Sequence, residues 1–182
     1  MSNDAIVLLR EDHKEVRRLF REYRGLADGD GRGDDQGHEY GHDQGHDQAR
    51  REAVERIVEA LTIHTYLEEE LVYPRIRREV PDLAEEMDRA KEEHHVADVL
   101  CEELSRMTPE DEGYDAKTAV LIEAVERHID EEEDAWFPRI RAALGRKELQ
   151  EIGERMKAVR ETAPRHPTGS GMLHRIANAL EG

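Results

Sequence analysis

Cysteine, aromatic residues and long apolar runs are all scarce in this sequence. Cys101 is the only cysteine among 182 residues, which excludes an internal disulfide and a zinc site built from cysteine pairs. Aromatic residues make up 4% of the chain, which argues against a β-sandwich or β-barrel. No apolar run reaches the length of a membrane-spanning helix, and no apolar signal-type segment opens the chain. We therefore expect a cytoplasmic chain that does not cross a membrane.

Basic residues are also fewer than acidic residues. The sequence has 27 of them against 44 acidic residues, which gives a formal net charge of −17. A chain this acidic repels phosphate backbones and anionic membrane surfaces, so neither nucleic acid nor a membrane is an expected partner. A Gly-rich phosphate-binding loop is absent, as is a Ser-His-Asp set in a plausible context, so no organic cofactor is expected.

Glu, Arg, Ala and Leu are abundant, and all four favour helices. Apolar side chains recur every three or four residues in four long segments, the pattern of amphipathic helices in one domain of the all-α class. The expected landmarks are an N-cap at Ser2 or Asn3 and an end near Gly25 for the first helix, a start at Ala49 for the second, a cap at Asp82 for the third, and a start near Tyr114 for the fourth. Pro74 is expected to break or kink the second helix, whose pattern continues to Glu79, and Pro138 occupies the corresponding place in the fourth.

Two other segments are expected to lie outside the four helices. Residues 28–48 are rich in Gly, Asp, Gln and His and offer little apolar surface to bury, which indicates a flexible loop. His38, His42 and His46 in this loop are interpreted as part of a solvated linker, in preference to a weak metal site. Residues 1–145 are expected to form the main domain. Residues 146–182 are expected to be a C-terminal extension with a short amphipathic helix, a linker and a small terminal helix over 172–180.

The chain contains an internal repeat. HTYLEEELVYPRIR at residues 64–77 matches HIDEEEDAWFPRIR at residues 128–141, with the His, two consecutive Glu, the Pro and the RIR sequence in register. Upstream of these segments, DHKEVRRLF at residues 12–20 is echoed by EHHVADVLC at residues 93–101. The protein is therefore expected to consist of two helical hairpins that contribute the same chemical groups.

A histidine interrupts the apolar stripe of each helix, and a glutamate follows four residues later in the second and fourth. The histidines are His13, His64, His94 and His128, and the glutamates are Glu68 and Glu132. Residues four apart lie on one face of a helix, so each His–Glu pair is expected to point toward the bundle axis. Burying an unpaired carboxylate is costly, and cations offset that cost. The pattern therefore predicts a metal site.

The donor types and their number narrow the choice of metal. Imidazole and carboxylate donors without thiolates favour iron or manganese over structural zinc. Six groups exceed the need of one tetrahedral ion, but two octahedral ions can share them if Glu68 and Glu132 bridge and each ion takes two histidines. With a bridging oxo or hydroxo group, each ion would keep one open position for dioxygen, peroxide or nitric oxide.

Four ordered motifs carry these groups. They are D-H in the first helix, H-x-x-x-E-E-x-x-x-Y-P in the second, E-E-H in the third and H-x-x-x-E-E-x-x-x-F-P in the fourth. Together they resemble the hemerythrin-like HHE cation-binding domain family over roughly residues 4–145. The resemblance implies an antiparallel up-down four-helix bundle and a carboxylate-bridged di-iron site, with His13, His64, Glu68, His94, His128 and Glu132 at the ligand positions. Ferritin-like di-iron proteins, the competing class, use Glu-x-x-His and more carboxylates than histidines.

Two positions depart from the oxygen-carrying hemerythrins. These proteins have a second histidine in the third helix where this chain has Asp98, and an aspartate where it has Glu133. With fewer histidines, redox chemistry is expected in preference to reversible oxygen carriage. The Tyr73-Pro74 pair resembles mycobacterial-type hemerythrin-like proteins, for which peroxide decomposition or nitric oxide chemistry is implied. Tyr73 would lie about half a turn from the face of His64, so it can approach the site only if Pro74 distorts the helix.

Residues beside the expected ligands have competing interpretations. His94 is expected to face inward and His95 outward, because His94 is in line with the apolar stripe of its helix. Asp98 is expected at the surface, with completion of a coordination sphere as the less favoured alternative. The other neighbours are interpreted as solvated face (Glu69, Glu70 and Glu133), as core (Cys101, Trp136 and Phe137), or as packing residues that could instead gate or contact the centre (Tyr66 and Tyr73).

Three functions remain compatible with the sequence. The first is a non-haem protein with two iron ions that reacts with dioxygen, peroxide or nitric oxide, with catalase-like turnover as one form of this chemistry. The second is non-enzymatic iron or oxygen sensing, or iron storage. The third is a metal-free helical adaptor. Peroxide turnover by the iron-loaded protein would separate the first from the second.

Overall fold

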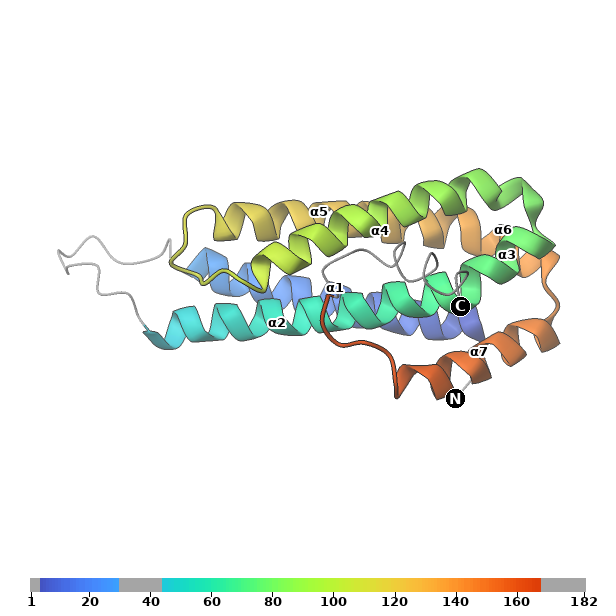
Figure 1. Ribbon diagram of the computed structural model, residues 1–182, viewed down its shortest axis with the longest axis horizontal. Helices are drawn as coiled ribbons and strands as arrows, with labels where there is room; N and C mark the ends of the chain where they lie inside the picture. Colours follow the sequence, from blue (N-terminus) through green and yellow to red (C-terminus); the bar gives the residue numbers. More distant parts are fainter. Residues whose placement is uncertain (1–3, 30–43, 168–182) are drawn as a thin grey trace, which may run out of the picture.

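The computed structural model describes residues 4–29 and 44–167, which form helices joined by turns and contain no β-strand. The four long helices are α1 (Ala5–Gly29), α2 (Gln44–Leu67), α4 (Ala84–Leu104) and α5 (Tyr114–Glu131). In Figure 1 they lie alongside one another, and the chain reverses direction from each to the next. None of the described helices is both long and apolar enough to span a membrane. The expected all-α fold class is confirmed.

A π-helical turn precedes each of the two repeated prolines. The second helix continues through η1 (Glu68–Val72) into α3 (Tyr73–Glu79), and the fourth continues through η3 (Glu132–Trp136) into α6 (Phe137–Ala143). Proline has no N–H to donate to the carbonyl four residues earlier. Within η1 the Tyr73 N–H donates to the Glu68 carbonyl, five residues back, and η3 has the corresponding bond. The expected break at Pro74 therefore takes the form of one wider helical turn.

The first helix differs from expectation at its C-terminal end. It continues past Gly25 to Gly29, because a glycine is tolerated inside a helix that packing stabilises. Its N-cap is Asp4, whose Oδ1 accepts a hydrogen bond of 2.9 Å from the Ile6 N–H. Ser2 and Asn3, the expected caps, lie outside the described residues.

The starts of the second and third long helices also differ from expectation. The second begins at Gln44, ahead of Ala49, and Asp47 places a negative charge in its first turn, where the helix dipole favours one. Asp82 does not cap α4, because it lies inside a 3₁₀ turn, η2 (Pro81–Leu83), that leads directly into the helix. The prediction of a cap at Asp82 was therefore wrong.

Part of the predicted loop and tail lies outside the described residues. Residues 30–43, which include His38 and His42, and the helix expected over 172–180 lie outside the described residues. His46 lies in the first turns of α2, so its placement in a loop was wrong. The helix reaches this position because its first turns are held by a buried ion pair, in which Arg50 Nη1 is 3.2 Å from Asp47 Oδ1.

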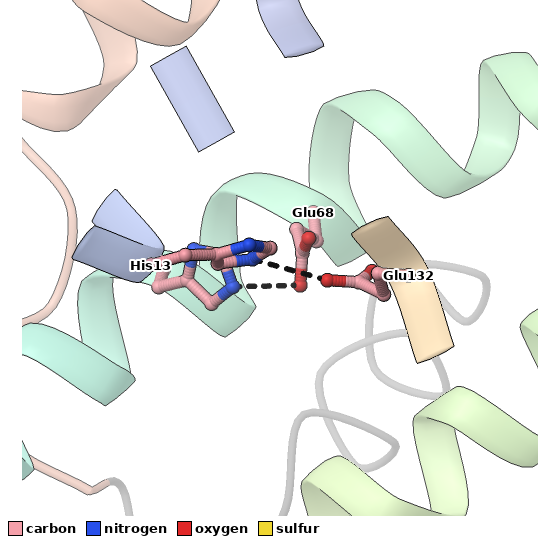
Figure 2. Close-up of side chains that lie close together, drawn as sticks. His13, Glu68 and Glu132 are labelled. Carbon is pink, nitrogen blue, oxygen red and sulfur yellow. Dashed lines mark ion pairs between the residues drawn. The ribbon is translucent and has the colours of Figure 1, made fainter. Parts of the chain in front are cut away.

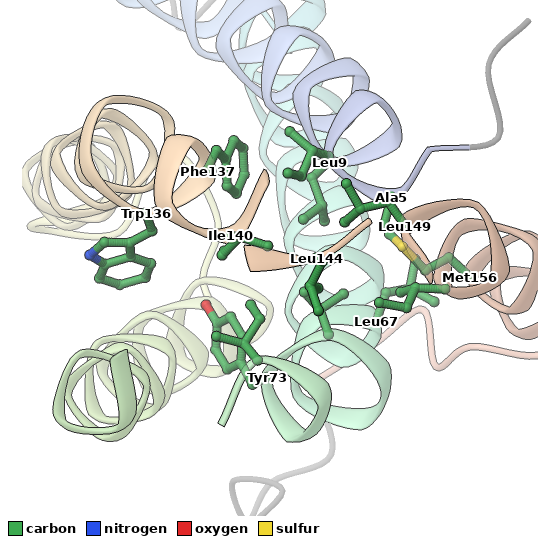
Figure 3. Close-up of a cluster of buried hydrophobic side chains, with 14 of the residues drawn as sticks. Ala5, Leu9, Leu67, Tyr73, Trp136, Phe137, Ile140, Leu144, Leu149 and Met156 are labelled. Carbon is green, nitrogen blue, oxygen red and sulfur yellow. The ribbon is translucent and has the colours of Figure 1, made fainter. Parts of the chain in front are cut away.

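Two clusters of buried apolar side chains fill the interior. One lies toward α3, α6 and α7 and contains Leu9, Leu67 and Phe137 (Figure 3). The other contains Phe20, Ile57 and Leu121. On α1, α2 and α4, the expected ligand histidine lies between buried residues of one cluster and buried residues of the other, and on α5 His128 lies near the end of the second cluster, beside Ile129. The candidate site is therefore a polar layer between two apolar regions.

A fifth substantial helix, α7 (Arg146–Arg160), contributes to the same interior. Leu149, Ile152 and Met156 on its apolar face join the first cluster, as the sequence pattern predicted for this segment. The helix packs against α1 and α2 (Figure 1). The segment that follows the four long helices therefore shares their core.

Candidate metal centre

The six expected ligands meet in the buried polar layer. Each is at most 5% exposed, and together they come from all four long helices and the π-helical turns. His13 is on α1, whereas Glu68 and Glu132 open η1 and η3. Figure 2 shows these three side chains pointing toward one another from separate elements. The structure thus brings together residues that are far apart in the sequence.

One group of potential metal donors comprises His13, His64, Glu68 and Glu132. Their donor atoms all lie within 4.8 Å of one another. His13 Nε2 is 3.1 Å from Glu132 Oε2, and His64 Nε2 is 3.3 Å from Glu68 Oε2. Two imidazoles and two carboxylates can therefore surround one cation.

A second group comprises Glu68, His94 and His128, again with donor atoms within 4.8 Å of one another. The Nε2 atoms of His94 and His128 are 3.1 Å apart, and His94 Nε2 is 3.4 Å from Glu68 Oε2. Glu132 Oε1 is 3.8 Å from His128 Nε2, so this carboxylate also borders the second group. Because Glu68 belongs to both groups, the two positions are adjacent and share a carboxylate.

An outer carboxylate faces the Nδ1 atom of every one of the four histidines. The pairs are Glu133 with His13 at 2.8 Å, Asp12 with His64 at 3.7 Å, Glu69 with His94 at 2.9 Å, and Glu93 with His128 at 2.8 Å. At the three shorter distances the ring must donate, because a carboxylate only accepts. Such partners fix the ring so that Nε2 faces the interior, and they increase its basicity.

This outer shell corrects two predictions. Glu69 and Glu133 were expected on the solvated face, but both are partly buried and contact His94 and His13, respectively, whereas Glu70 is exposed as expected. The physical reason is that the second Glu of each E-E pair turns back toward the neighbouring helix, where an imidazole offers an N–H. The internal repeat was a sequence signal for these outer contacts. The E-E pairs at 68–69 and 132–133 recur in register, as do the acid-His pairs at 12–13 and 93–94.

Tyr73 lies against the centre. Its hydroxyl is 3.2 Å from Glu132 Oε1, 3.3 Å from Glu68 Oε2 and 3.4 Å from His94 Nε2, and its ring stacks on His94 with centroids 5.6 Å apart. The π-helical turn before Pro74 brings it there. Phe137, the counterpart of Tyr73 in the repeat, stacks on His13 at 5.6 Å.

The exposure of the other neighbouring side chains agrees with expectation except at Asp98. His94 is buried and His95 is exposed, as expected. Asp98, expected at the surface, is half-buried and lines a cavity beside the centre. Trp136, Phe137 and Cys101 are buried, as expected for core residues, and Tyr66 is half-buried.

The electrostatics of the layer suit cations. Among the residues that the structure describes, buried polar atoms without a hydrogen-bond partner include Nε2 of His13, Nε2 of His64, Oε1 of Glu68 and Oε2 of Glu132. Burial lowers the pKa of His64 and His94, which keeps both imidazoles neutral and able to donate a lone pair. Burial and the nearby charge of Glu132 raise the pKa of Glu68 well above its usual range. The residues present therefore fit a pair of bound cations, which would pair with both carboxylates.

Comparisons with known proteins agree with this geometry. The sequence matches the family model "Hemerythrin HHE cation binding domain" over residues 4–140. The structure is similar to that of a hemerythrin HHE cation binding domain-containing protein from Mycobacterium kansasii, with 23% sequence identity and a TM-score of 0.62. The similarity covers 87% of this chain and 86% of that chain. No curated protein matches the sequence significantly. Since the family model spans well over half of its length, the chain belongs to the hemerythrin HHE cation-binding domain family.

Proposed function

We propose that this chain is a non-haem di-iron protein that reacts with dioxygen, peroxide or nitric oxide. Its metal ligands would be His13, His64, Glu68, His94, His128 and Glu132. The observation that carries the proposal is the sharing of Glu68 by two adjacent groups of buried donors. In this proposal α1, α2, α4 and α5 form an antiparallel up-down bundle within a domain of residues 1–145, and residues 146–182 form a C-terminal extension.

The donor chemistry supports iron. Both groups offer nitrogen and oxygen donors, without a thiolate among the described residues within reach. When bound, an iron pair would supply one-electron redox steps and open positions for a small molecule. The outer carboxylates hold the imidazoles in place, and the two apolar clusters keep bulk water away from them.

Tyr73 has a separate proposed role. Its hydroxyl lies within hydrogen-bond distance of both inner carboxylates, so it can orient them by donating a hydrogen bond. Burial and both carboxylates raise its pKa well above the usual range, which keeps the phenol protonated while the carboxylates are unpaired. We propose that Tyr73 orients the carboxylates of Glu68 and Glu132, with direct ligation as the alternative.

The first test is metal content together with the ultraviolet and visible absorption spectrum after expression with iron. We expect close to two irons per chain and oxo-to-iron charge-transfer absorption, both lost in the double variant His64→Ala, Glu132→Ala. The matched control is His95→Ala, Glu70→Ala, which changes the same residue types at exposed positions. A folded protein without iron above background would refute the di-iron proposal.

A second candidate is non-enzymatic iron or oxygen sensing. It is favoured by a contact between α7 and the centre: Arg160 Nη2 is 2.5 Å from Asp12 Oδ2, and the same oxygen is 3.7 Å from Nδ1 of His64. A change at the metal could therefore reach a helix outside the matched residues 4–140. Iron storage, the related alternative, has little capacity in a centre of two ions. Consumption of peroxide by the iron-loaded protein would favour the first candidate, and binding without turnover the second.

A further inference from the structure

The exposed apolar side chains of this protein gather on two neighbouring helices. Of the residues that the structure describes, three large apolar side chains are exposed, namely Val96 (53%), Val99 (40%) and Val120 (54%). Val96 and Val99 lie on α4, and Val120 lies on α5. These helices pack side by side (Figure 1), so one surface of the molecule holds all three valines. Exposed apolar side chains that cluster in this way mark interaction sites more often than single ones do.

Charged side chains extend the apolar residues into two ordered stripes. On α4 the stripe has acidic ends and steps of four, three and four residues, and consists of Glu92, Val96, Val99 and Glu103. On α5 the stripe has basic ends and steps of three, four and three residues, and consists of Lys117, Val120, Ala124 and Arg127. Steps of three and four keep each stripe on one side of its helix. We call these two stripes together the α4–α5 face.

The packing of the two helices sets the stripes next to each other. The helices run in opposite directions, Lys117 forms an ion pair with Glu103 near one end, and the His94 and His128 rings lie 4.8 Å apart farther along. At 1.5 Å per residue, this register gives four levels along the face. The levels are Glu92 with Arg127, Val96 with Ala124, Val99 with Val120, and Glu103 with Lys117. Both residues of the first two levels line the same cavity, which agrees with this register.

The charges at one end of the face have no ion-pair partner within the chain. Glu92 and Arg127 are exposed, and neither forms an ion pair with another of the described residues. At the other end, Lys117 and Glu103 pair with each other but keep part of their surface exposed. An apolar centre with a charged rim is the usual composition of a protein interface.

We propose that the α4–α5 face binds a second copy of this chain. A two-fold axis parallel to the helices places α4 of one copy over α5 of the other at the same levels. Each acidic end then meets a basic end, and the valines of α4 meet the apolar centre of the α5 stripe. A two-fold axis across the helices would instead place Glu92 of one copy over Glu103 of the other, and Arg127 over Lys117. Because like charges oppose that arrangement, the order of charges selects the first dimer.

The size of the face sets the strength of this dimer. Each stripe is about 17 Å long or less, at 1.5 Å per residue. Stable interfaces bury about 800 Å² on each partner, so a face this short belongs to the weak, transient class. The two copies also repel, since each has a net charge of −17, but salt screens charges beyond about 8 Å. We therefore expect dimers at concentrations of about 0.1 mM and above, and monomers after dilution.

Sedimentation velocity of the full chain between about 0.01 and 1 mM measures this equilibrium. We expect it in the iron-free and the iron-loaded protein alike. Glu92→Arg and Arg127→Glu should each weaken the dimer by about tenfold or more, because each brings like charges together at two symmetry-related places. An equimolar mixture of these two variants should associate as strongly as the wild type, since every contact in the mixed dimer again joins an acid and a base.

Matched controls separate these contacts from net charge. Glu154→Arg and Arg155→Glu make the same changes of charge at exposed positions on α7, and both should dimerise as the wild type does. Val99→Glu should abolish the dimer, because it places a carboxylate in the apolar centre of the interface. Circular dichroism and Tm verify that each variant is folded.

Three outcomes would overturn the proposal. They are a wild-type chain that stays monomeric to the highest concentration, a dimer that the two charge-reversal variants leave intact, and a mixture of those variants that stays monomeric. The proposal does not rest on the proposed function. Failure to bind iron would end the di-iron proposal and leave the sedimentation result to decide the dimer by itself.

Discussion

At the scale of single residues, Glu68 is distinguished by its membership of both donor groups. We therefore expect Glu68→Gln to lower the affinity for both ions, by about 100-fold or more, because a neutral amide is a poor bridging ligand. Glu132→Gln should retain more metal than Glu68→Gln. The measurement is metal per chain after dialysis against a weak chelator, with the exposed Glu70→Gln as control. Equal losses in the two inner variants would contradict the unequal roles.

Tyr73 offers a second test, because its hydroxyl contacts both inner carboxylates. Tyr73→Phe should destabilise the iron-free protein by about 1–3 kcal/mol, since buried carboxylate oxygens lose a donor. Iron content should remain unchanged. Chemical denaturation measures the first effect, with the half-buried Tyr66→Phe as control. Loss of iron in Tyr73→Phe would instead favour Tyr73 as a ligand.

The sequence predicted which residues face the interior, but it did not predict which side chains contact the inward-facing histidines. His94 could be distinguished from His95 because a buried face repeats every three to four residues. The outer roles of Glu69 and Glu133 were missed, because periodicity alone places a glutamate next to the buried stripe on the solvent side. Their partial burial depends on an imidazole from another helix, which only the packed structure supplies.

At the scale of helices, the two π-helical turns were the part of the fold that the sequence did not predict. The number and order of the long helices followed from apolar spacing at 3.6 residues per turn. That spacing fails across η1 and η3, because a π-helical bond spans five residues and changes the direction of every later side chain. From the sequence, Tyr73 could therefore be expected near the centre only if Pro74 distorted the helix. The sequence did not indicate that the distortion would be a π-helical turn.

The contact between α7 and the metal layer yields a third prediction. Arg160→Gln should speed iron release to a chelator by up to about tenfold, because Asp12 beside His64 loses its cation. The effect on folding should stay below about 1 kcal/mol, since the ion pair is partly exposed. Arg160→Lys should restore slow release in part. The control is Arg155→Gln, an exposed position on the same helix, and faster release there too would refute a specific role for Arg160.

At the scale of the whole molecule, metal binding should be linked to folding, because six buried polar side chains acquire partners when ions bind. With free iron at about 100 times the dissociation constant, the linkage contributes about 2.7 kcal/mol for each bound ion, or roughly 5–10 °C in Tm per ion for a chain of this size. Calorimetry of iron-loaded and chelator-treated protein measures the shift. The double variant His64→Ala, Glu132→Ala should show no dependence of Tm on iron. A Tm that is the same with and without iron in the wild-type chain would contradict the linkage.

The position of the polar layer between two apolar clusters bears on how cooperatively the molecule opens. Without iron, the clusters are joined mainly through the helices that run between them, so each can open in a separate event. Bound ions would tie all four long helices together at the middle of the interior. Hydrogen exchange should then show two classes of slow amides in the iron-free chain, one per cluster, and a single class when iron is bound. Iron would thus decide whether this protein unfolds as two units or as one.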